Sequence, residues 1–263
     1  MFLQLRKSSK TDSFGLSALV PVHLWMARFA VIVTLLSFIF NTHCCGQVTV
    51  CLHSMVGADS LVLDTATYRN GLSQPYTVTM LRYYVSHLQI DYADGDHFSD
   101  AGYYLVDARE HGSEQIVLKG ARRTGIRQIS FLVGVDSLHN CSGAQSGALD
   151  PINGMFWTWN TGYIFFKMEG RSPSSSSRGG VFEFHIGGYK TPYNCLRTVH
   201  LNLENNSPGK DAATINIIAD IGKMMAKPAP LDFSKTSSVT DFHGAMPMAD
   251  RYYQMFYIDR DSR

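Results

Sequence analysis

The sequence predicts an all-β protein, a single antiparallel β-sandwich-like domain with one or two short helices near the C-terminus. Short apolar runs alternate with polar residues along most of the chain, which is typical of half-buried strands. The 22 Gly and 9 Pro are scattered between these runs as turn residues. No internal repeat and no linker between two folded parts is evident, so one domain over residues 47–263 is the simplest interpretation.

The strands follow in order from this pattern. Val48, Val50 and Leu52 alternate with residues of the opposite face, and a longer run over residues 76–92 ends at the hairpin signal Ala93-Asp94-Gly95. Further strands are expected at residues 103–107, 115–118, 126–135, 181–186 and 196–203, and residues 155–169 are the most aromatic stretch, interrupted by Gly162. The serine-rich residues 172–180 form a polar loop, and only residues 217–225 and 246–257 look helical.

Two of these strands carry a histidine each. Phe182, Phe184 and Ile186 share one face of the first, so His185 lies on the other; Val199, Leu201 and Leu203 likewise place His200 on a polar face. If the two strands pair as an antiparallel hairpin, their apolar faces must coincide. The histidines would then share a face, about 4.5–5.5 Å apart at Cβ if directly opposed. That is close enough to bind one metal ion.

The N-terminal region predicts export. Residues 29–40 are apolar, follow Arg28, and are too short to span a bilayer but of the length found in signal peptides. Cys44 and Gly46 are small residues suited to cleavage after Gly46. We therefore expect residues 1–46 to be a signal peptide region, with Met26 as an alternative start.

The expected location is the periplasm, the cell envelope or the outside of the cell. A lipid anchor on Cys44 or Cys45 is the alternative, and it is disfavoured because residues 41–43 lack the aliphatic and small residues of a lipidation motif. Beyond residue 46, three cysteines remain: Cys51, Cys141 and Cys195. A bridge between Cys141 and Cys195 is the favoured pairing in an oxidising compartment, although the sequence does not decide it.

Charge and motifs exclude several functions. The 23 basic and 22 acidic side chains form no basic stripe, which argues against a nucleic-acid partner. Neither a nucleophile elbow, a zinc-protease helix motif nor a phosphate-binding loop is present, so we expect no enzyme activity.

Two motifs carry a family resemblance. Met155-Phe-Trp-Thr-Trp-Asn-Thr-Gly-Tyr163 and Phe182-Glu-Phe-His-Ile-Gly-Gly188 resemble the MbnP-like family of bacterial exported copper-binding proteins. Weaker similarity extends over the remainder of the chain after residue 46. The resemblance implies a secreted copper carrier for acquisition or buffering, with an envelope redox or membrane-transport partner.

The resemblance also suggests ligands. Some members use histidines together with a tryptophan oxidised to kynurenine, so Trp157 or Trp159 would belong to the copper site. His185 occupies the motif position expected of a ligand. The His-x-His pair of some relatives is absent here, since residue 187 is Gly. The second ligand would then come from His200, His53, His87 or His243.

The residue chemistry allows copper, because imidazole binds copper, nickel and zinc, and divalent affinity peaks at Cu²⁺. Each histidine has a simpler interpretation as a hydrogen-bonded or solvated strand residue. Trp157 and Trp159 are equally explained as core residues. The alternative function is therefore a metal-free binding or adhesion module, in which Trp157, Trp159, Tyr163 and Tyr189 form core or a carbohydrate-facing platform.

Overall fold

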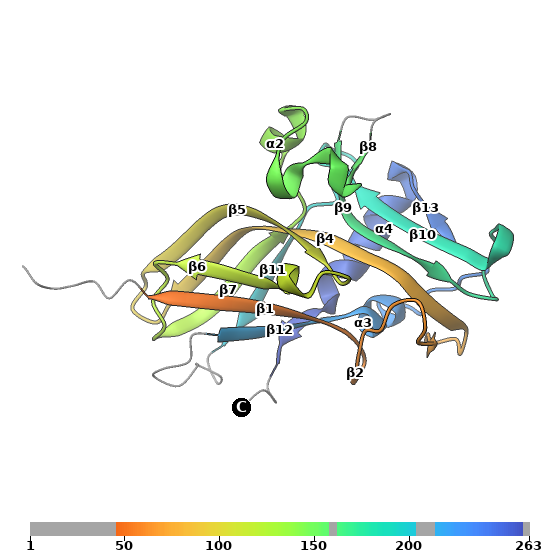
Figure 1. The fold of residues 1–263 in the computed structure, drawn as a ribbon, viewed down its shortest axis with the longest axis horizontal. Coiled ribbons are helices and arrows are strands. Elements are labelled where there is room, and N and C mark those ends of the chain that lie inside the picture. Colours follow the sequence, from red (N-terminus) through yellow and green to blue (C-terminus); the bar gives the residue numbers. More distant parts are fainter. Residues whose placement is uncertain (1–45, 158–161, 204–213, 260–263) are drawn as a thin grey trace, which may run out of the picture. The chain divides into compact units, whose positions relative to one another are not determined.

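A computed structural model describes the fold over residues 46–157, 162–203 and 214–259 (Figure 1). Two mixed sheets form the framework of the fold, and short helices connect or cover the strands. Within the described ranges, no helix is both long enough and apolar enough to cross a lipid bilayer. All of the predicted signal region except Gly46 lies outside the described residues.

The smaller sheet has five strands among the described residues, joined around β1. In spatial order they are β14 (Phe256–Ile258), β12 (Thr214–Asp220), β1 (Gln47–Val56) and β2 (Asp59–Ser60), with β6 (Gln115–Lys119) also paired to β1. β1 and β12 run parallel, and they pair from Thr49 with Thr214 to Met55 with Asp220.

The larger sheet has nine strands among the described residues. Its main order is β11 (Arg197–Asn202), β7 (Ile126–Val133), β4 (Pro75–Tyr92), β9 (Gly162–Arg171), β10 (Val181–Gly187) and β13 (Ser238–Val239). Three more strands join it: β3 (Tyr68–Arg69) and β5 (His97–Asp107) on β4, and β8 (Phe156–Trp157) on β9.

Strand β4 organises the larger sheet. Its 18 residues pair with β5 along residues 82–91, with β9 along residues 77–83 and with β7 along residues 85–92. Because β5 overlaps both β7 and β9 along β4, the latter two must lie end to end on the opposite edge of β4. Segments far apart in the sequence are thereby held at defined positions along one strand.

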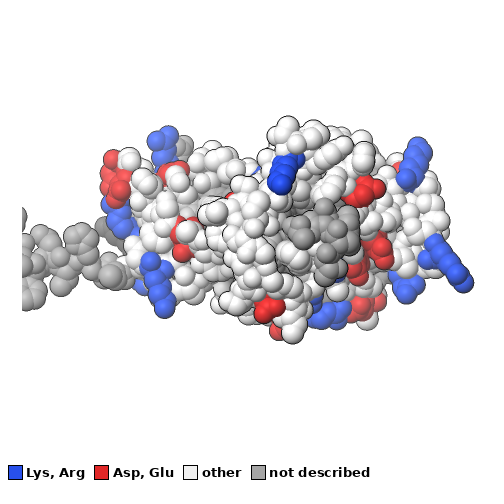
Figure 2. Space-filling model, turned by 90° about the horizontal axis from the view of Figure 1, so that it is seen from above, with Lys and Arg blue, Asp and Glu red and all other residues white. Residues whose placement is uncertain are grey.

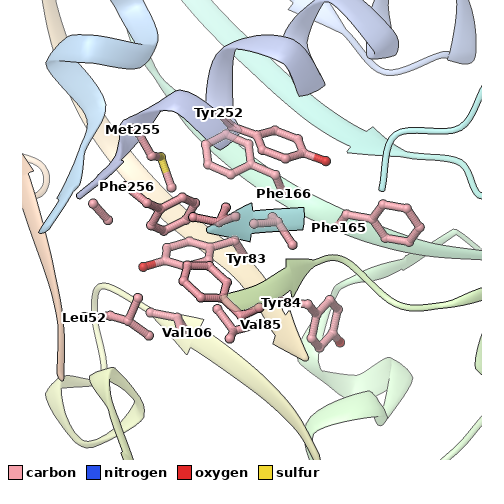
Figure 3. Packing of buried hydrophobic residues seen from close by; sticks show 14 of the residues in the cluster. Leu52, Tyr83, Tyr84, Val85, Val106, Phe165, Phe166, Tyr252, Met255 and Phe256 are labelled. Atoms are coloured by element: carbon pink, nitrogen blue, oxygen red, sulfur yellow. The ribbon is translucent and has the colours of Figure 1, made fainter. Parts of the chain in front are cut away.

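An aromatic core fills the space between the sheets (Figure 3). Tyr83 and Phe131 of the larger sheet pack edge-on against Phe256 of the smaller one, with ring centroids 5.6 and 5.1 Å apart. The ring of Phe166 stacks on Tyr252, the last residue of α4 (Phe242–Tyr252), at 5.1 Å. Such pairs contribute about 0.5–1.5 kcal/mol each beyond the burial of their area. The sheet-dominated, sandwich-like prediction is confirmed.

Most predicted strands and both predicted strand faces are also confirmed. Phe182, Phe184 and Ile186 are fully buried while His185 is partly exposed, and Val199 and Leu201 are buried while His200 is exposed. The predicted hairpin at Ala93-Asp94-Gly95 joins β4 to β5.

The predicted pairing of the two histidine strands is wrong. β10 pairs with β9 across the serine-rich loop, and β11 pairs with β7. Alternation decides which face is buried, but the aromatic packing of β9 against the core decides which strand lies beside β10. The purely antiparallel prediction is wrong as well, because β1–β12 and β10–β13 are parallel pairs.

The helical predictions need two corrections. Residues 217–220 belong to strand β12, because their apolar side chains are buried beside β1, and helix α3 (Ile221–Ala226) begins only after Asp220 caps it. The last helix begins at Phe242 rather than residue 246, because Asp241 accepts hydrogen bonds from the His243 and Gly244 amides. It ends at Tyr252.

One excursion from the larger sheet positions the candidate site. Between β7 and β9, residues 134–157 form helix α2 (Ser137–Cys141), two 3-10 turns, η2 (Gly147–Leu149) and η3 (Pro151–Asn153), and strand β8. Figure 1 shows this segment, here called the lobe, beside the ends of β9 and β10. Figure 2 looks onto it and shows acidic and basic side chains interspersed rather than gathered into a patch of one sign.

Candidate metal centre

His87 is turned out of the larger sheet by a β-bulge. The pairing of β4 with β5 skips from Ser86–Tyr103 to Leu88–Asp100, which leaves His87 unpaired. Its backbone is left-handed, with φ of 49°. That conformation costs a non-glycine residue about 1–2 kcal/mol. Ser86 and Leu88 stay buried on either side, so the bulge presents the imidazole to solvent without disturbing the core.

The lobe brings a second histidine to the same place. Asp136 is the N-cap of α2, and its Oδ1 accepts a hydrogen bond of 3.0 Å from the backbone N–H of His139. Asn140 anchors this turn to the sheet, because its Oδ1 accepts a 2.9 Å hydrogen bond from the Tyr163 amide of β9. The short helix therefore holds Asp136 and His139 in a defined orientation over the sheet.

Four polar side-chain atoms from three segments of the chain meet there. Nε2 of His87 lies 3.0 Å from Oδ2 of Asp136, and Nδ1 of His139 lies 3.1 Å from the same oxygen. The hydroxyl of Tyr103, on β5, donates a short hydrogen bond to this carboxylate and lies 2.7 Å from Nδ1 of His139 and 3.4 Å from Nε2 of His87. We call His87, Tyr103, Asp136 and His139 the His87 cluster.

The cluster is ordered yet open to solvent. The side chains of His87, Asp136 and His139 are 41, 23 and 33% exposed, so an ion can reach them. The Tyr103 ring lies 4.4 Å from the His139 ring and 5.6 Å from the His87 ring, measured between centroids. The two imidazoles thus position the phenol between them.

Two pKa shifts follow from this arrangement. Burial would raise the pKa of Asp136, but hydrogen bonds from the Tyr103 hydroxyl and the His139 amide outweigh it and keep the pKa below its usual value. Burial, reinforced by the hydrogen bond to Asp136 and by its charge, raises the pKa of Tyr103. The cluster therefore contains an ionised carboxylate beside a protonated phenol at neutral pH.

The cluster would have to rearrange before it could hold a metal ion. In the described part of the chain, no group of three His, Cys, Asp or Glu side chains is arranged to hold an ion as it stands. In the His87 cluster, the Tyr103 hydroxyl contacts both imidazoles and the carboxylate. An ion can therefore enter only if this hydroxyl shifts or itself becomes a ligand.

Comparison with known proteins identifies the family. A family model described as MbnP matches residues 45–242. The chain belongs to the MbnP family. Among curated proteins none matches. A solved structure, MbnP from Methylosinus trichosporium, is similar with a TM-score of 0.53 and 15% identity over 72% of this chain and 79% of that one. At this identity the similarity concerns the fold alone.

In this MbnP-family protein, His185 lies far from the His87 cluster in the register of the sheet. Its Nε2 is 2.8 Å from Oε1 of Glu169 on β9. His185 itself pairs with Lys167 of β9, which in turn pairs with Arg82 of β4. His200 pairs with Ser130 of β7, which in turn pairs with Gln89 of β4. Arg82 and Gln89 are seven residues apart along β4, which corresponds to about 23 Å at 3.3 Å per residue. The expectation that His185 and His200 share an ion is therefore wrong.

The other predicted histidines are also separate from one another. His53, on β1, is exposed, and its Nε2 lies 2.9 Å from Oδ1 of Asn216. His243, on α4, is exposed and lies 5.4 Å from the Tyr193 ring. Among the described residues, His87 is the one predicted ligand that the structure brings together with a further histidine, and that partner is His139.

The first of the two predicted tryptophans is a buried residue of β8. Trp157 is 6% exposed and packs edge-on against Phe242 with a centroid distance of 5.9 Å. It lines an open cavity of about 250 Å³ together with Asn140, Gly162, Tyr163, Gly188, Tyr189, Lys190, Thr191, Tyr193 and Phe242. No histidine belongs to this described lining. Trp159 lies outside the described residues.

The predicted Cys141–Cys195 bridge does not form. All three cysteines in the described ranges are free thiols. Cys141 is exposed on α2 with its Sγ 3.4 Å from the Tyr189 hydroxyl, whereas Cys195 is fully buried. Tyr252 donates a hydrogen bond to the carbonyl of Cys195 and holds that segment in the core.

Three members of the cluster were not predicted as ligands: Tyr103, Asp136 and His139. The spacing of Asp136 and His139 did contain a signal, because a helix-capping Asp and a residue three positions later lie on the same side of the first turn. Their proximity to His87 depends on the pairing of β4 with β7, which alternation alone does not specify.

Proposed function

We propose that this MbnP-family protein is an exported copper-binding protein that carries or buffers a copper ion at the His87 cluster. The observation that carries the proposal is the convergence of two imidazoles and an ionised carboxylate at a solvent-accessible point. Imidazole nitrogens bind copper well, and the affinity of such sites for divalent first-row metals peaks at Cu²⁺. Family membership and the sequence resemblance to copper-binding relatives support the same function.

The backbone around the cluster supports a binding role. A left-handed histidine at a bulge is costly, and such strain concentrates at functional sites. The bulge is the feature that aims His87 at Asp136. A purely structural strand histidine, such as His53, needs no such distortion.

The decisive experiment measures copper content and affinity. The full chain is expressed in a bacterium, the exported form is purified, and copper is determined by elemental analysis and by competition with a chelator. We expect one copper per chain in the wild type. His87→Asn and His139→Asn should each weaken binding at least about tenfold, as expected for loss of a ligand. Asn at position 87 tolerates the left-handed backbone, so that variant should fold.

His53→Asn and His200→Asn are the matched controls, because both remove an exposed strand imidazole outside the cluster. They should bind copper as the wild type does. The proposal fails if the wild type takes up no copper, or if the control variants lose as much affinity as the cluster variants. A partner in the envelope that delivers or accepts copper is part of the proposal.

The second candidate is a metal-free binding module, favoured by the aromatic cavity beside Trp157. The half-buried Tyr189 and Tyr193 line it together with the buried Trp157. Titration with soluble oligosaccharides, followed by tryptophan fluorescence, tests this candidate. Binding that Tyr189→Ala abolishes, in a protein without copper uptake, would replace the first proposal with the second.

A further inference from the structure

We propose that the cavity beside Trp157 binds a small aromatic acid, with its ring among the aromatic side chains and its carboxylate on the ammonium group of Lys190. This site is separate from the His87 cluster, so the proposal does not depend on copper binding there. It gives the cavity a ligand of a different chemical class from the sugar of the metal-free alternative. Three features carry it: the aromatic rings of the lining, its single formal charge and the hydrogen bonds that its buried polar groups already make.

Aromatic rings form much of the described lining. Phe242, the first residue of α4, packs edge-on against Trp157 and stacks on Tyr193, with ring centroids 5.9 Å apart in both pairs. The volume of about 250 Å³ exceeds the roughly 150 Å³ of a cavity that binds benzene, so a ring with a short acidic side chain has room. Sites for small molecules are mostly apolar with a few polar groups. This lining therefore suits a planar apolar ring.

A closed loop after β10 holds the more exposed part of the lining in place. The backbone N–H of Cys195 donates to the Gly188 carbonyl at 2.8 Å and closes residues 188–195 into this loop. Gly188 has φ of 123°, and a Cβ atom there would clash with the Tyr193 carbonyl oxygen, so the close approach requires glycine. The loop contributes four further lining residues: Tyr189, Lys190, Thr191 and Tyr193. One closed segment thus presents both aromatic rings and the lysine.

Lys190 gives the cavity a positive charge that the described lining does not balance. It is exposed, its Nζ lies 5.1 Å from the Tyr189 ring centroid, and it forms no ion pair in the described part of the chain. No Asp or Glu belongs to the described lining. Aromatic rings alone also attract cations, but the ammonium group repels a cationic ligand and attracts an anionic one. The lining therefore favours a carboxylate over an amine.

The buried polar groups of the lining already have partners. Oδ1 of Asn140 accepts a hydrogen bond from the Tyr163 amide at 2.9 Å, and its Nδ2 donates to the Asp136 carbonyl at 2.9 Å. The Tyr163 hydroxyl donates to the Leu149 carbonyl at 2.7 Å. A sugar in the cavity would find few partners for its hydroxyls among these groups, and buried unpaired hydroxyls are costly. An aromatic ring brings no such groups.

The test titrates the purified exported protein with indole-3-acetate as the probe, followed by isothermal titration calorimetry. Tryptamine has the same ring with an ammonium group in place of the carboxylate, and 3-methylindole has neither charge. We expect one indole-3-acetate to bind per chain. The affinity for 3-methylindole should be about tenfold lower, because a hydrogen bond to a charged group contributes enough for such a factor, and that for tryptamine lower still. This series needs no variant.

Lys190→Gln and Lys119→Gln test the charge directly. Lys119 is an exposed lysine of β6 outside the described lining, so it is the matched control, and both substitutions lie at exposed positions that should leave the fold intact. Lys190→Gln should lower the affinity for indole-3-acetate about tenfold and leave that for 3-methylindole unchanged. Lys119→Gln should bind both probes as the wild type does. Thermal unfolding checks that both variants fold.

Failure of this proposal is distinguishable from failure of the proposed function. Absence of indole-3-acetate binding, equal binding of tryptamine, or an equal loss in Lys119→Gln overturns it, whether or not copper binds. Binding of cellobiose but not of indole-3-acetate overturns it in favour of the sugar-binding alternative. His87→Asn should bind indole-3-acetate as the wild type does, because His87 is outside the described lining. Loss of copper with retained indole-3-acetate binding in that variant supports both proposals.

Discussion

Nε2 of His87 lies 3.0 Å from Oδ2 of Asp136, although 49 residues separate the two along the chain. Two hydrogen bonds bring them together: the Gly134 amide donates to the Tyr84 carbonyl at 3.1 Å, and the buried Ser86 hydroxyl donates to the Gly134 carbonyl at 2.9 Å. The lobe therefore leaves the sheet directly beside the bulge. Pairing between strands therefore fixes the positions of His87 and Asp136 relative to each other.

Removing the motif histidine should leave copper binding intact. His185 pairs with Glu169 outside the His87 cluster, and the pair is partly exposed. We expect His185→Ala to bind copper with wild-type affinity and to lose no more than about 1 kcal/mol of unfolding free energy, as is usual for such ion pairs. Chelator competition and urea unfolding measure the two quantities. Loss of copper binding in this variant would show that the copper site includes His185 on β10.

Asp136 has two roles that different substitutions separate. Asp136→Asn keeps an N-cap oxygen for the His139 amide but removes the negative charge, so it should keep the stability of α2 while weakening copper binding. Asp136→Ala removes both, and should in addition lower the unfolding free energy by about 1 kcal/mol. Unfolding curves and copper titrations of both variants check this. Equal stability of the two variants would show that the cap contributes nothing.

Two neighbouring tyrosines of β4 should respond oppositely to loss of their hydroxyls. The buried hydroxyl of Tyr83 has no hydrogen-bond partner in the described structure, whereas that of Tyr84 donates to the Ala148 carbonyl at 2.9 Å. Because an unsatisfied buried polar group is costly, Tyr83→Phe should raise the unfolding free energy by about 1 kcal/mol, and Tyr84→Phe should lower it by about as much. Urea denaturation gives both values, and the reverse order would contradict the expected packing.

The cysteines should differ strongly in reactivity. Burial raises the pKa of Cys195 to about 11, so this residue stays a neutral thiol in the native protein until the pH approaches that value. Iodoacetamide should therefore modify the exposed Cys141 first and leave Cys195 unmodified at pH 8, as peptide mass mapping would show. Unfolded protein, labelled at every cysteine, is the control. Labelling of native Cys195, or a Cys141–Cys195 bridge in purified protein, would contradict the structure.

The sequence predicted strands and their buried faces better than their partners. Alternation identified the buried sides of residues 182–186 and 199–203, because each face is a local property of the chain. Which strands become neighbours depends on packing across the whole core, so β10 and β11 were wrongly joined. The helical prediction for residues 217–220 failed for the same reason, since burial beside β1 overrides local preference.

The candidate site was predictable only in part. His87 was among the predicted ligands, and the capping spacing of Asp136 and His139 was visible in the sequence. The bulge that turns His87 outward had a signal that was not used: the alternating apolar positions are odd-numbered from Leu81 to Val85 and even-numbered from Leu88 onward, so the alternation shifts by one residue at the bulge. Tyr103 was indistinguishable from other strand aromatics until the register of β4 with β5 was known.

The long β4 strand also has a consequence for when the proposed copper ion would be acquired. The donors come from β4, β5 and the lobe that follows β7, so an unfolded chain contains only scattered single ligands of low affinity. A metal ion can be chosen only after these strands have docked. Under the proposed function, the composition of the compartment in which folding finishes would therefore determine which metal the protein meets first.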